Sequence, residues 1–488
     1  MIAPLLKRGL ALVACAAAIA LGACSTNPAT GEQSFTAFMS PQDESRIGAE
    51  QHPQILKKFG GSYDDPELGA YVATLGARLA AVSDRPDLNF TFTVLDSPVV
   101  NAFALPGGYV YVSRGLLALA NNEAEVAGVL GHEIAHVTAR HSAERYSRSV
   151  VVNLGAGILG AVTGQRSIAD LANLGGGLYL RSYSRENEFE ADSLGLRYMT
   201  RLGYDPAAVA DFLLSLRAET ALQARLRASD ADPDSFNLLS THPRTVDRVR
   251  EAQQATGTLA PGRLERDLYL RRIDGMLYGD DPEEGFIRDR TFIHPLLRFR
   301  FTAPPGFRLV NSSDRVEGIG PNGLGMIFDS VREPSGMSME RYLATGPWTR
   351  DLDLFDLQGF TVNGMNAATA GATVRTQRGT LGYRLIAIRA GPDQVYRFVF
   401  LGAPNALAAS GEELRRTTYS FERIGEGEAA TYQPHRLRVV QVQPGDTVDT
   451  LAARMPEGPE KRARFMVLNG LAEGARLEPG MLVKIVGD

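Results

Sequence analysis

Two histidines and a glutamate within five residues are the side chains of this sequence best suited to chemistry. The stretch reads His132-Glu133-Ile134-Ala135-His136 and lies within residues 123–145. Residues four apart share one face of a helix, so His132 and His136 can offer two imidazole nitrogens to one metal ion. Glu133 lies one step around the turn, close enough to polarise a water molecule at that ion. The spacing predicts the ligands and the base of a zinc hydrolase.

The surrounding sequence predicts the helix that these residues need. Asn122 with Glu125 three residues later resembles a capping box. Apolar residues then recur at helical spacing, at Val126, Val129, Leu130, Ile134 and Val137. Gly128 and Gly131 lower helix propensity, which indicates that another element packs closely there. The alternative interpretation is a buried helix whose histidines only form hydrogen bonds.

A zinc site needs a third ligand, and one acidic cluster offers it. His141 is one residue short of the place that a third histidine takes in the metzincin pattern, and residues 145–185 contain no glutamate. Glu188 and Asp192 come next, four apart on one helical face, with Gly195 on the same face to permit close packing. We expect Glu188 to be the third ligand. Asp192 would accept a hydrogen bond from the other nitrogen of a ligand histidine; the alternative is a solvated acidic helix face.

These residues and two further motifs resemble one family of metallopeptidases. Residues 101–112 read NAFALPGGYVYV, and Ser240-Thr241-His242-Pro243 is followed by Arg248. Together with HExxH and ExxxD, they are similar to the gluzincins that include the CAAX prenyl proteases, HtpX and the periplasmic BepA-like proteases. The match covers about residues 40–255 in the family's order of motifs. It implies a mainly helical zincin protease domain with a small sheet and one Zn²⁺ per chain.

The resemblance also implies that His242 and Arg248 lie near the zinc. They would stabilise the oxyanion of the tetrahedral intermediate, or His242 would occupy the open position on zinc and hold the enzyme inactive. The alternative is a helix-capping histidine with no role in catalysis. The remaining histidines lack partners at ligand spacing and are not expected to bind metal: His52, His141, His294 and His435.

The segment before the HExxH helix predicts strands. Residues 89–95 and 108–113 alternate in polarity, with the second strand following a Pro-Gly-Gly turn. In zincins, the strand before this helix typically forms an edge along the cleft, where a substrate backbone can add as a further strand. The substrate-binding residues would be Gly108, Tyr109, Val110 and Tyr111. The alternative is an inner strand of the sheet.

Residues 1–24 have the features of a bacterial lipoprotein signal. Lys7 and Arg8 precede an apolar run over residues 10–23, which is short for a membrane span. The run ends in Leu-Gly-Ala-Cys, which resembles a lipobox with Cys24 as the acylated residue. Ser25 after it implies retention at the outer membrane of a Gram-negative bacterium, facing the periplasm. The alternative is an uncleaved anchor.

The composition is that of a globular protein, with 44% hydrophobic and 22% charged residues. The formal net charge of −5 becomes −7 when Lys7 and Arg8 leave with the signal, which argues against nucleic acid as a partner. Cys15 also lies in the signal, so Cys24 would be the one cysteine left and no disulfide framework is expected.

The sequence predicts an α+β protein of several parts. The expected parts are a tether over 25–39, the protease domain over 40–270, a linker over 271–291, an accessory α+β domain over 292–425 and a small βααβ domain over 436–488. The accessory domain has strand patterns at 297–301 and 307–311, a hairpin of 383–389 and 395–401, and a helix at 406–418. Residues 150–164 are apolar and rich in glycine and alanine; we favour a buried helix over a mobile element above the site.

The last part resembles a LysM module. It carries Val442-Gln443-Pro444-Gly445-Asp446-Thr447-Val448, then Asn469-Gly470-Leu471, then the closing run 477–485. The resemblance implies binding to the N-acetylglucosamine chains of peptidoglycan. Its centre, residues 455–461, carries two prolines and is longer than usual, so the fold is better supported than glycan binding.

The sequence as a whole predicts a lipid-anchored periplasmic zinc endopeptidase that acts on misfolded or stalled envelope proteins, in outer-membrane protein quality control. A second hypothesis is a chaperone or assembly factor for outer-membrane proteins, with proteolysis held off by His242 or by residues 150–164. A third is a structural lipoprotein that binds the cell wall. The retained ligands and Glu133 disfavour that third hypothesis.

Overall fold

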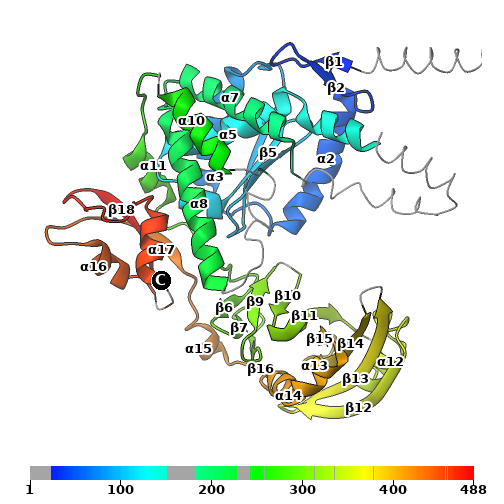
Figure 1. The fold of residues 1–488 in the computed structure, drawn as a ribbon. Helices are drawn as coiled ribbons and strands as arrows, with labels where there is room; N and C mark the ends of the chain where they lie inside the picture. Colours follow the sequence, from blue (N-terminus) through cyan, green and yellow to red (C-terminus); the bar gives the residue numbers. More distant parts are fainter. Residues whose placement is uncertain are drawn as a thin grey trace, which may run out of the picture. The chain divides into compact units, whose positions relative to one another are not determined.

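The computed structural model describes residues 24–150, 182–227, 242, 245–257, 259–312, 314–334, 336–376, 379–456, 458 and 460–487. The chain forms two compact units (Figure 1). The first contains the described residues up to Tyr278 together with Arg436–Gly487, and the second contains Gly279–His435. Residues 1–23 of the expected signal and all but the first residue of 150–164 lie outside the described ranges. Among the described helices, none is both long and apolar enough to span a membrane.

The first unit begins with a hairpin and two capped helices. Strand β1 (Cys24–Thr26) pairs antiparallel with β2 (Gln33–Phe35). Helix α2 (Pro41–Lys58) starts at Ser40, whose side chain accepts a hydrogen bond from the Asp43 backbone N–H, and α3 (Pro66–Ala81) starts at Asp65 in the same way. Proline at the first helical position suits both starts, because its fixed φ matches the helix and no N–H is lost from the ladder.

Residues 25–39 are folded onto the first unit, so the expected tether is wrong for this segment. The Asn27 amide donates to Glu190 Oε1 at 2.7 Å, and the Phe38 backbone N–H donates to Ser147 Oγ at 3.2 Å. Met39 is buried in a small apolar cluster with Ile55. Small polar residues favoured a tether, but the side-chain partners that hold this segment lie more than 100 residues further along the chain.

A three-stranded sheet lies before the HExxH helix. Its order is β3 (Thr91–Leu95), β5 (Tyr109–Ser113), β4 (Ala102–Leu105), with β5 parallel to β3 and antiparallel to β4. Strand β4 was not expected from the sequence. Helix α4 (Arg114–Leu119) follows β5 directly, with Ser113 as its N-cap.

The HExxH helix is α5 (Glu123–Thr138), and it packs against α7 (Arg185–Arg201). Asn122 caps α5 by accepting from the Glu125 backbone N–H, as predicted. A Cβ placed on Gly195 would lie 2.7 Å from the His132 nitrogen, and one on Gly131 would lie 3.0 Å from the Gly195 oxygen. The two helices therefore touch glycine to glycine, which brings their side chains close together. Helix α8 (Ala207–Arg227), α10 (Thr245–Thr256) and α11 (Arg266–Ile273) complete this helical layer.

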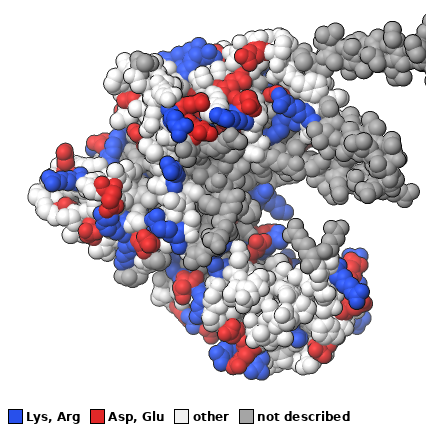
Figure 2. Space-filling view, in the orientation of Figure 1, with Lys and Arg blue, Asp and Glu red and all other residues white. Residues whose placement is uncertain are grey.

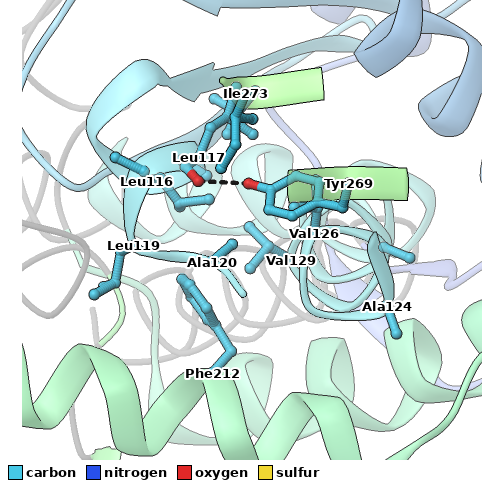
Figure 3. Packing of buried hydrophobic residues seen from close by; sticks show 14 of the residues in the cluster. Leu116, Leu117, Leu119, Ala120, Ala124, Val126, Val129, Phe212, Tyr269 and Ile273 are labelled. Atoms are coloured by element: carbon cyan, nitrogen blue, oxygen red, sulfur yellow. Dashed lines mark hydrogen bonds between the residues drawn. The ribbon is translucent and has the colours of Figure 1, made fainter. Parts of the chain in front are cut away.

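The main core of the first unit lies between α4, the start of α5, α8 and α11 (Figure 3). Tyr269 of α11 is fully buried and donates its hydroxyl proton to the Leu117 carbonyl at the end of α4. Phe212 reaches this core from α8, and Val126 and Val129 reach it from α5. This packing fixes the N-terminal end of the HExxH helix.

The C-terminal segment has the strand–helix–helix–strand order expected of it. Strand β17 (Arg436–Gln441) pairs antiparallel with β18 (Leu482–Gly487), and α16 (Val448–Ala453) and α17 (Lys461–Leu468) lie between them in the chain. Its apolar residues Leu437, Leu451, Phe465 and Ile485 belong to the same core as α5 and α8. The segment is therefore part of the first unit and not a separate compact domain as the sequence predicted.

The second unit is built on two antiparallel sheets. The larger has the order β12 (Leu354–Val362), β13 (Met365–Thr376), β14 (Gly379–Arg389), β15 (Gln394–Gly402), β11 (Gly325–Arg332), β10 (Val316–Ile319), β9 (Arg308–Asn311). The smaller has the order β16 (Glu422–Arg423), β8 (Phe299–Thr302), β7 (Thr291–His294), β6 (Phe286–Arg288). The predicted hairpin is β14–β15, in which Arg389 pairs with Val395.

Helices cover both faces of the larger sheet. Helix α12 (Met339–Thr345) packs with Ala370, Leu385 and Ala387. Helix α14 (Gly411–Tyr419) packs with Ile386, Phe398 and Phe400 on the other face, next to α13 (Pro404–Ala409). The single helix expected over 406–418 is thus two helices that meet at Ser410. The linker expected over 271–291 contains the end of α11 and all of β6, with the boundary between the units at Tyr278. On the face of the second unit seen in Figure 2, charged side chains lie mainly toward the margins.

Candidate metal centre

Helices α5 and α7 bring together the three ligands expected from the sequence. The ligand atoms of His132, His136, Glu188 and His242 all lie within 4.8 Å of one another, and all four residues are buried. The two His Nε2 atoms are 3.0 Å apart, and each lies 3.6 Å from an oxygen of Glu188. His132 and His136 face the same side of α5 because they are one turn apart.

The chemistry of these residues fits a bound zinc ion. Neither carboxylate oxygen of Glu133 has a hydrogen-bond partner among the described residues, although the side chain is fully buried. A buried polar group without a partner is unfavourable, so such atoms point to an absent ligand. Burial, with help from the positive charge of neighbouring histidines, holds the pKa of His136 well below its usual value. His136 is therefore neutral, as a metal ligand must be.

Burial also raises the pKa of Glu133, although the nearby His242 and His132 oppose the shift. Its Oε1 lies 3.4 Å from His242 Nε2. A cavity of about 30 Å³ lies beside it, lined by His132, Glu133, His242 and other residues of the first unit. That volume exceeds the roughly 10–15 Å³ that a cavity needs to hold one water molecule. Glu133 can thus face a water molecule held between itself and the ligands.

Asp192 and Arg248 support the ligands from behind. Asp192 Oδ1 lies 2.9 Å from His132 Nδ1, which leaves Nε2 of that ring for a metal. The Arg248 guanidinium donates to both Asp192 oxygens at 2.7 Å and lies 3.0 Å from Glu188 Oε2. Burial opposes ionisation of Asp192, but Arg248 and His132 together outweigh burial and lower the pKa of Asp192. The oxyanion role expected for Arg248 is not favoured, because its guanidinium is engaged by Asp192 and Glu188.

His242 lies within the ligand cluster itself. Its Nδ1 is 2.9 Å from Glu188 Oε1 and 3.1 Å from His132 Nε2. Burial lowers the pKa of His242, but the carboxylates of Glu188 and Glu133 outweigh it and the net shift is upward. The structure therefore places His242 where a fourth ligand would be, between the histidines and the two glutamates.

His141 is a supporting residue that the sequence reasoning missed. Its Nδ1 lies 2.8 Å from His136 Nδ1, and its Nε2 lies 3.2 Å from Glu190 Oε2. The chain reverses just after α5 at Arg140, whose φ of 61° lies in the left-handed region. The Arg140 guanidinium is held by Glu44 at 3.0 Å and by the Met39 carbonyl at 2.8 Å. The one signal for this contact in the sequence is that a histidine, His141, follows His136 by five residues, just outside the helix.

Tyr183 is a second residue that was missed. Its ring stacks on His136 with centroids 3.9 Å apart and an interplanar angle of 15°. The Arg145 guanidinium lies over the Tyr183 ring, 4.1 Å from the ring centroid. The stack fixes the plane of the His136 ring. No sequence pattern marks it, because Tyr183 is 47 residues from His136 in a sequence that offers several tyrosines.

The expected substrate strand is an inner strand. Tyr109, Val110 and Tyr111 lie in β5, which pairs with β3 on one side and β4 on the other, and Gly108 lies in the turn before it with φ of 91°. The backbone groups of β5 are therefore hydrogen-bonded to a neighbouring strand on each side. This arrangement excludes the addition of a substrate strand to β5. The prediction took the second strand for the edge because it did not include β4 (Ala102–Leu105).

Comparisons with known proteins agree with this geometry. The model of peptidase family M48 matches residues 66–256, which contain the whole ligand cluster. A putative beta-barrel assembly-enhancing protease of Vibrio cholerae is 32% identical over 241 residues, which are 47% of this chain and 48% of that protein. The beta-barrel assembly-enhancing protease of Escherichia coli is 31% identical over 220 residues, 43% of each chain. The mitochondrial metalloendopeptidase OMA1 of Schizosaccharomyces pombe is 34% identical over 219 residues, 43% of this chain and 60% of that one.

The chain spans about half the length of these curated relatives. The shared part is the one that holds α5, α7 and the supporting residues Asp192 and Arg248. Residues 66–256 of this chain form a peptidase family M48 domain.

Proposed function

We propose that the first unit is a zinc-dependent endopeptidase. The observation that carries the proposal is the meeting of His132, His136 and Glu188 beside Glu133, a buried carboxylate without a hydrogen-bond partner among the described residues. Two imidazoles and a carboxylate are a common protein ligand set for catalytic zinc. The relatives carry the words protease and metalloendopeptidase in their names, which supports the same activity here.

Each residue of the metal centre would have a separate role in peptide hydrolysis. Zinc held by His132, His136 and Glu188 would supply a Lewis acid that polarises the peptide carbonyl and acidifies water. Glu133 takes the proton of the attacking water and then gives it to the leaving amine. Its raised pKa suits a group that both accepts and returns a proton. Asp192 holds the His132 ring in place for this reaction.

We further propose that His242 keeps the resting enzyme latent. Its Nδ1 lies among the ligand atoms, 2.9 Å from Glu188 Oε1, and its Nε2 lies 3.4 Å from Glu133 Oε1. A substrate would have to displace His242 before its carbonyl could approach the site. The competing role, in which His242 helps to stabilise the oxyanion, predicts the opposite effect of removing the ring.

Zinc content and casein cleavage, measured together, test both proposals. Wild type should hold about one zinc per chain, and Glu188→Ala should lose it. Glu186→Ala is the matched control, because Glu186 is an exposed residue of the same helix turn. Zinc retained in Glu188→Ala would overturn the ligand assignment. His242→Ala that keeps zinc and cleaves faster supports a latch, whereas slower cleavage with zinc kept supports a catalytic aid.

We propose a setting in the envelope for this activity. Two of the relatives have names that describe beta-barrel assembly, which supports an outer-membrane context and envelope proteins as substrates. The lipobox-like sequence at Cys24 supports a lipid anchor and a periplasmic location. The LysM-like sequence of 436–488 supports contact with peptidoglycan. Labelling with radioactive palmitate, lost in Cys24→Ser, and pull-down on purified peptidoglycan would test these two attachments.

The alternative function is a chaperone or assembly factor with the protease held latent. The position of His242 among the ligands is the observation that favours it. Glu133→Gln separates the two functions in cells. If the variant supports normal outer-membrane assembly under stress, the chaperone function suffices; if it fails like a deletion, proteolysis is required.

A further inference from the structure

The second unit contains a cavity of about 570 Å³ between its larger sheet and its helices. This volume falls within the roughly 300–1,000 Å³ of ordinary small-molecule sites. The floor comes from β12, β13, β14 and β15, and the opposite wall comes from α13 and α14. It is separate from the metal centre, which lies wholly in the first unit.

The strand register explains why the sheet is hollow here. Phe355, Gly371, Arg384 and Phe400 form one row across the four strands, because Phe355 pairs with Gly371, Gly371 with Arg384, and Arg384 with Phe400. A Cβ on Gly371 would meet the Phe355 ring at 2.4 Å, so the ring lies over the glycine. The glycine thus leaves the middle of the row without a side chain, and phenylalanines stand at both ends.

One face of α14 closes the cavity from the other side. The residues that line it recur at helical spacing, at Gly411, Leu414, Arg415, Thr418 and Tyr419. Leu414 is buried, whereas Tyr419 is 45% exposed and Phe355 is 47% exposed. The cavity therefore has apolar walls inside and large aromatic rings that reach solvent.

Two arginines line this mostly apolar space, one from each wall. Arg384 is half-buried on the sheet floor, and Arg415 is an exposed residue of α14. Within the described part of the chain, neither guanidinium has a hydrogen bond or an ion pair, and no aspartate or glutamate lines the cavity. The next arginine, Arg416, is by contrast paired with Glu412. An unpaired guanidinium among apolar side chains favours an anionic partner.

We propose that this cavity binds a fatty acid, with the carboxylate at Arg384 and Arg415 and the acyl chain over Phe400, Ile386 and Leu407. A cavity of roughly 150 Å³ holds a six-carbon molecule such as benzene, so a several-fold larger one accommodates a long acyl chain. A planar carboxylate matches the fork of a guanidinium. A peptide segment fits less well, because each residue brings an N–H and a C=O that mostly apolar walls leave unpaired.

Calorimetric titration of the full-length, delipidated protein with myristate below its critical micelle concentration tests the proposal. We expect one site per chain, and affinity that falls roughly four-fold for each methylene removed. Arg384→Gln should weaken binding at least ten-fold. Arg341→Gln is the control, since Arg341 is an exposed residue of α12 on the opposite face of the sheet and should leave affinity unchanged. Tetradecyltrimethylammonium, with the same chain and the opposite charge, should bind at least ten-fold more weakly.

A filling variant tests the site without touching the arginines. Thr373 lines the cavity on β13 and is exposed, so Thr373→Trp should occupy the space, abolish myristate binding and leave the melting temperature unchanged. The proposal is overturned if binding is not saturable, if the cation binds as well as myristate, or if Arg341→Gln and Arg384→Gln act alike. Binding of an apolar peptide in place of myristate would also overturn it. None of these outcomes bears on the peptidase, because zinc content and casein cleavage are read independently.

Discussion

Two buried clusters of charge flank helix α5, and they differ in whether their polar atoms have partners. At the start of the helix, Lys484 is fully buried and donates hydrogen bonds to the carbonyls of Ala118, Leu119 and Ala120 at 2.7, 3.1 and 2.6 Å. At the metal centre, the buried Glu133 has no hydrogen-bond partner among the described residues. In the first, the paired cluster, each proton of the buried Lys484 cation has an acceptor, and the cation holds segments of chain together. In the second, the unpaired cluster, a buried carboxylate lacks a hydrogen-bond donor, which points to a ligand.

The paired cluster joins the C-terminal segment to the catalytic helix. The three acceptor carbonyls lie at the end of α4, where the helix dipole favours a cation. Glu125, in the first turn of α5, accepts from the Asn121 backbone N–H and from the Asn122 amide, both at 2.9 Å. Burial lowers the pKa of Lys484 while Glu125 opposes the shift, and burial raises the pKa of Glu125. Three carbonyl acceptors require three N–H donors, so the ammonium form fits this site.

The largest expected effect comes from the unpaired cluster. Glu133→Gln keeps the size of the side chain and removes the base, so casein cleavage should fall by about 10²–10⁴-fold. Zinc content should stay near that of the wild type, and the melting temperature should not fall, because a buried carboxylate without a hydrogen-bond partner is replaced by a neutral amide. Matched measurements of zinc, melting temperature and cleavage check this. A large fall in melting temperature would show that Glu133 is a structural residue, and the contrast between the clusters would fail.

A substitution in the paired cluster should instead lower the stability of the protein. Lys484→Met leaves three buried carbonyls without this donor and removes one of the cations near Glu125, so the free energy of unfolding should fall by about 3–5 kcal/mol. Urea unfolding of the full chain measures the change. Arg476→Met is the control, since Arg476 is an exposed cation of the same C-terminal segment. If Lys484→Met and the control unfold alike, the buried ammonium is not what joins the segment to α5.

The sequence predicted the metal centre better than the Lys484 cluster, because the signals for the metal centre lie close together in the chain. The HExxH spacing and the Asn122 cap follow from residues a few positions apart on one helix. Lys484 reads in the sequence as a polar residue in the closing strand of a LysM-like module. Its carbonyl acceptors lie 364 to 366 residues away, and no local pattern records a contact at that distance.

The same limit explains the other differences. His141 was set aside because its spacing does not suit a metal ligand, yet it contacts His136 because Arg140 turns the chain back. Strand β4 was missed because its four residues are all buried and do not alternate in polarity. An inner strand was thus taken for an edge. Contacts marked by helical spacing on α5 and α7 were predicted, whereas contacts that no local pattern marks were missed.

Substitution of Asp192 tests how much zinc affinity depends on the residues that support the ligands. Asp192→Asn removes the charge that Arg248 and His132 share, so zinc should bind about 10–100-fold more weakly while the fold is kept. Competition with a zinc-binding dye gives the dissociation constant. Asp247→Asn on α10 is the control, because Asp247 forms only a 3.9 Å ion pair with Arg250 on the surface. Equal zinc affinity in the two variants would remove Asp192 from the metal centre.

The smallest expected effect is the pH dependence of stability that His294 of the second unit causes. Unlike the metal-centre histidines, this buried histidine lies among apolar rings and accepts a backbone hydrogen bond. Its ring packs against Phe292 and Phe299, and its Nδ1 accepts a hydrogen bond from the Leu297 backbone N–H at 3.3 Å. Burial lowers the pKa of His294 to about 4, so between that value and the ordinary value of about 6.5 the unfolded chain binds more protons than the folded one. Stability should therefore fall as pH falls through this window, by about 3 kcal/mol, and the contribution of this residue should not change with pH above about pH 7. The difference in unfolding free energy between wild type and His294→Gln, followed from pH 7 to pH 4, isolates the effect because the metal-centre histidines titrate alike in both proteins. A difference that stays constant across the window would mean that the His294 ring has the same pKa in the folded and the unfolded chain, so that burial does not oppose its protonation.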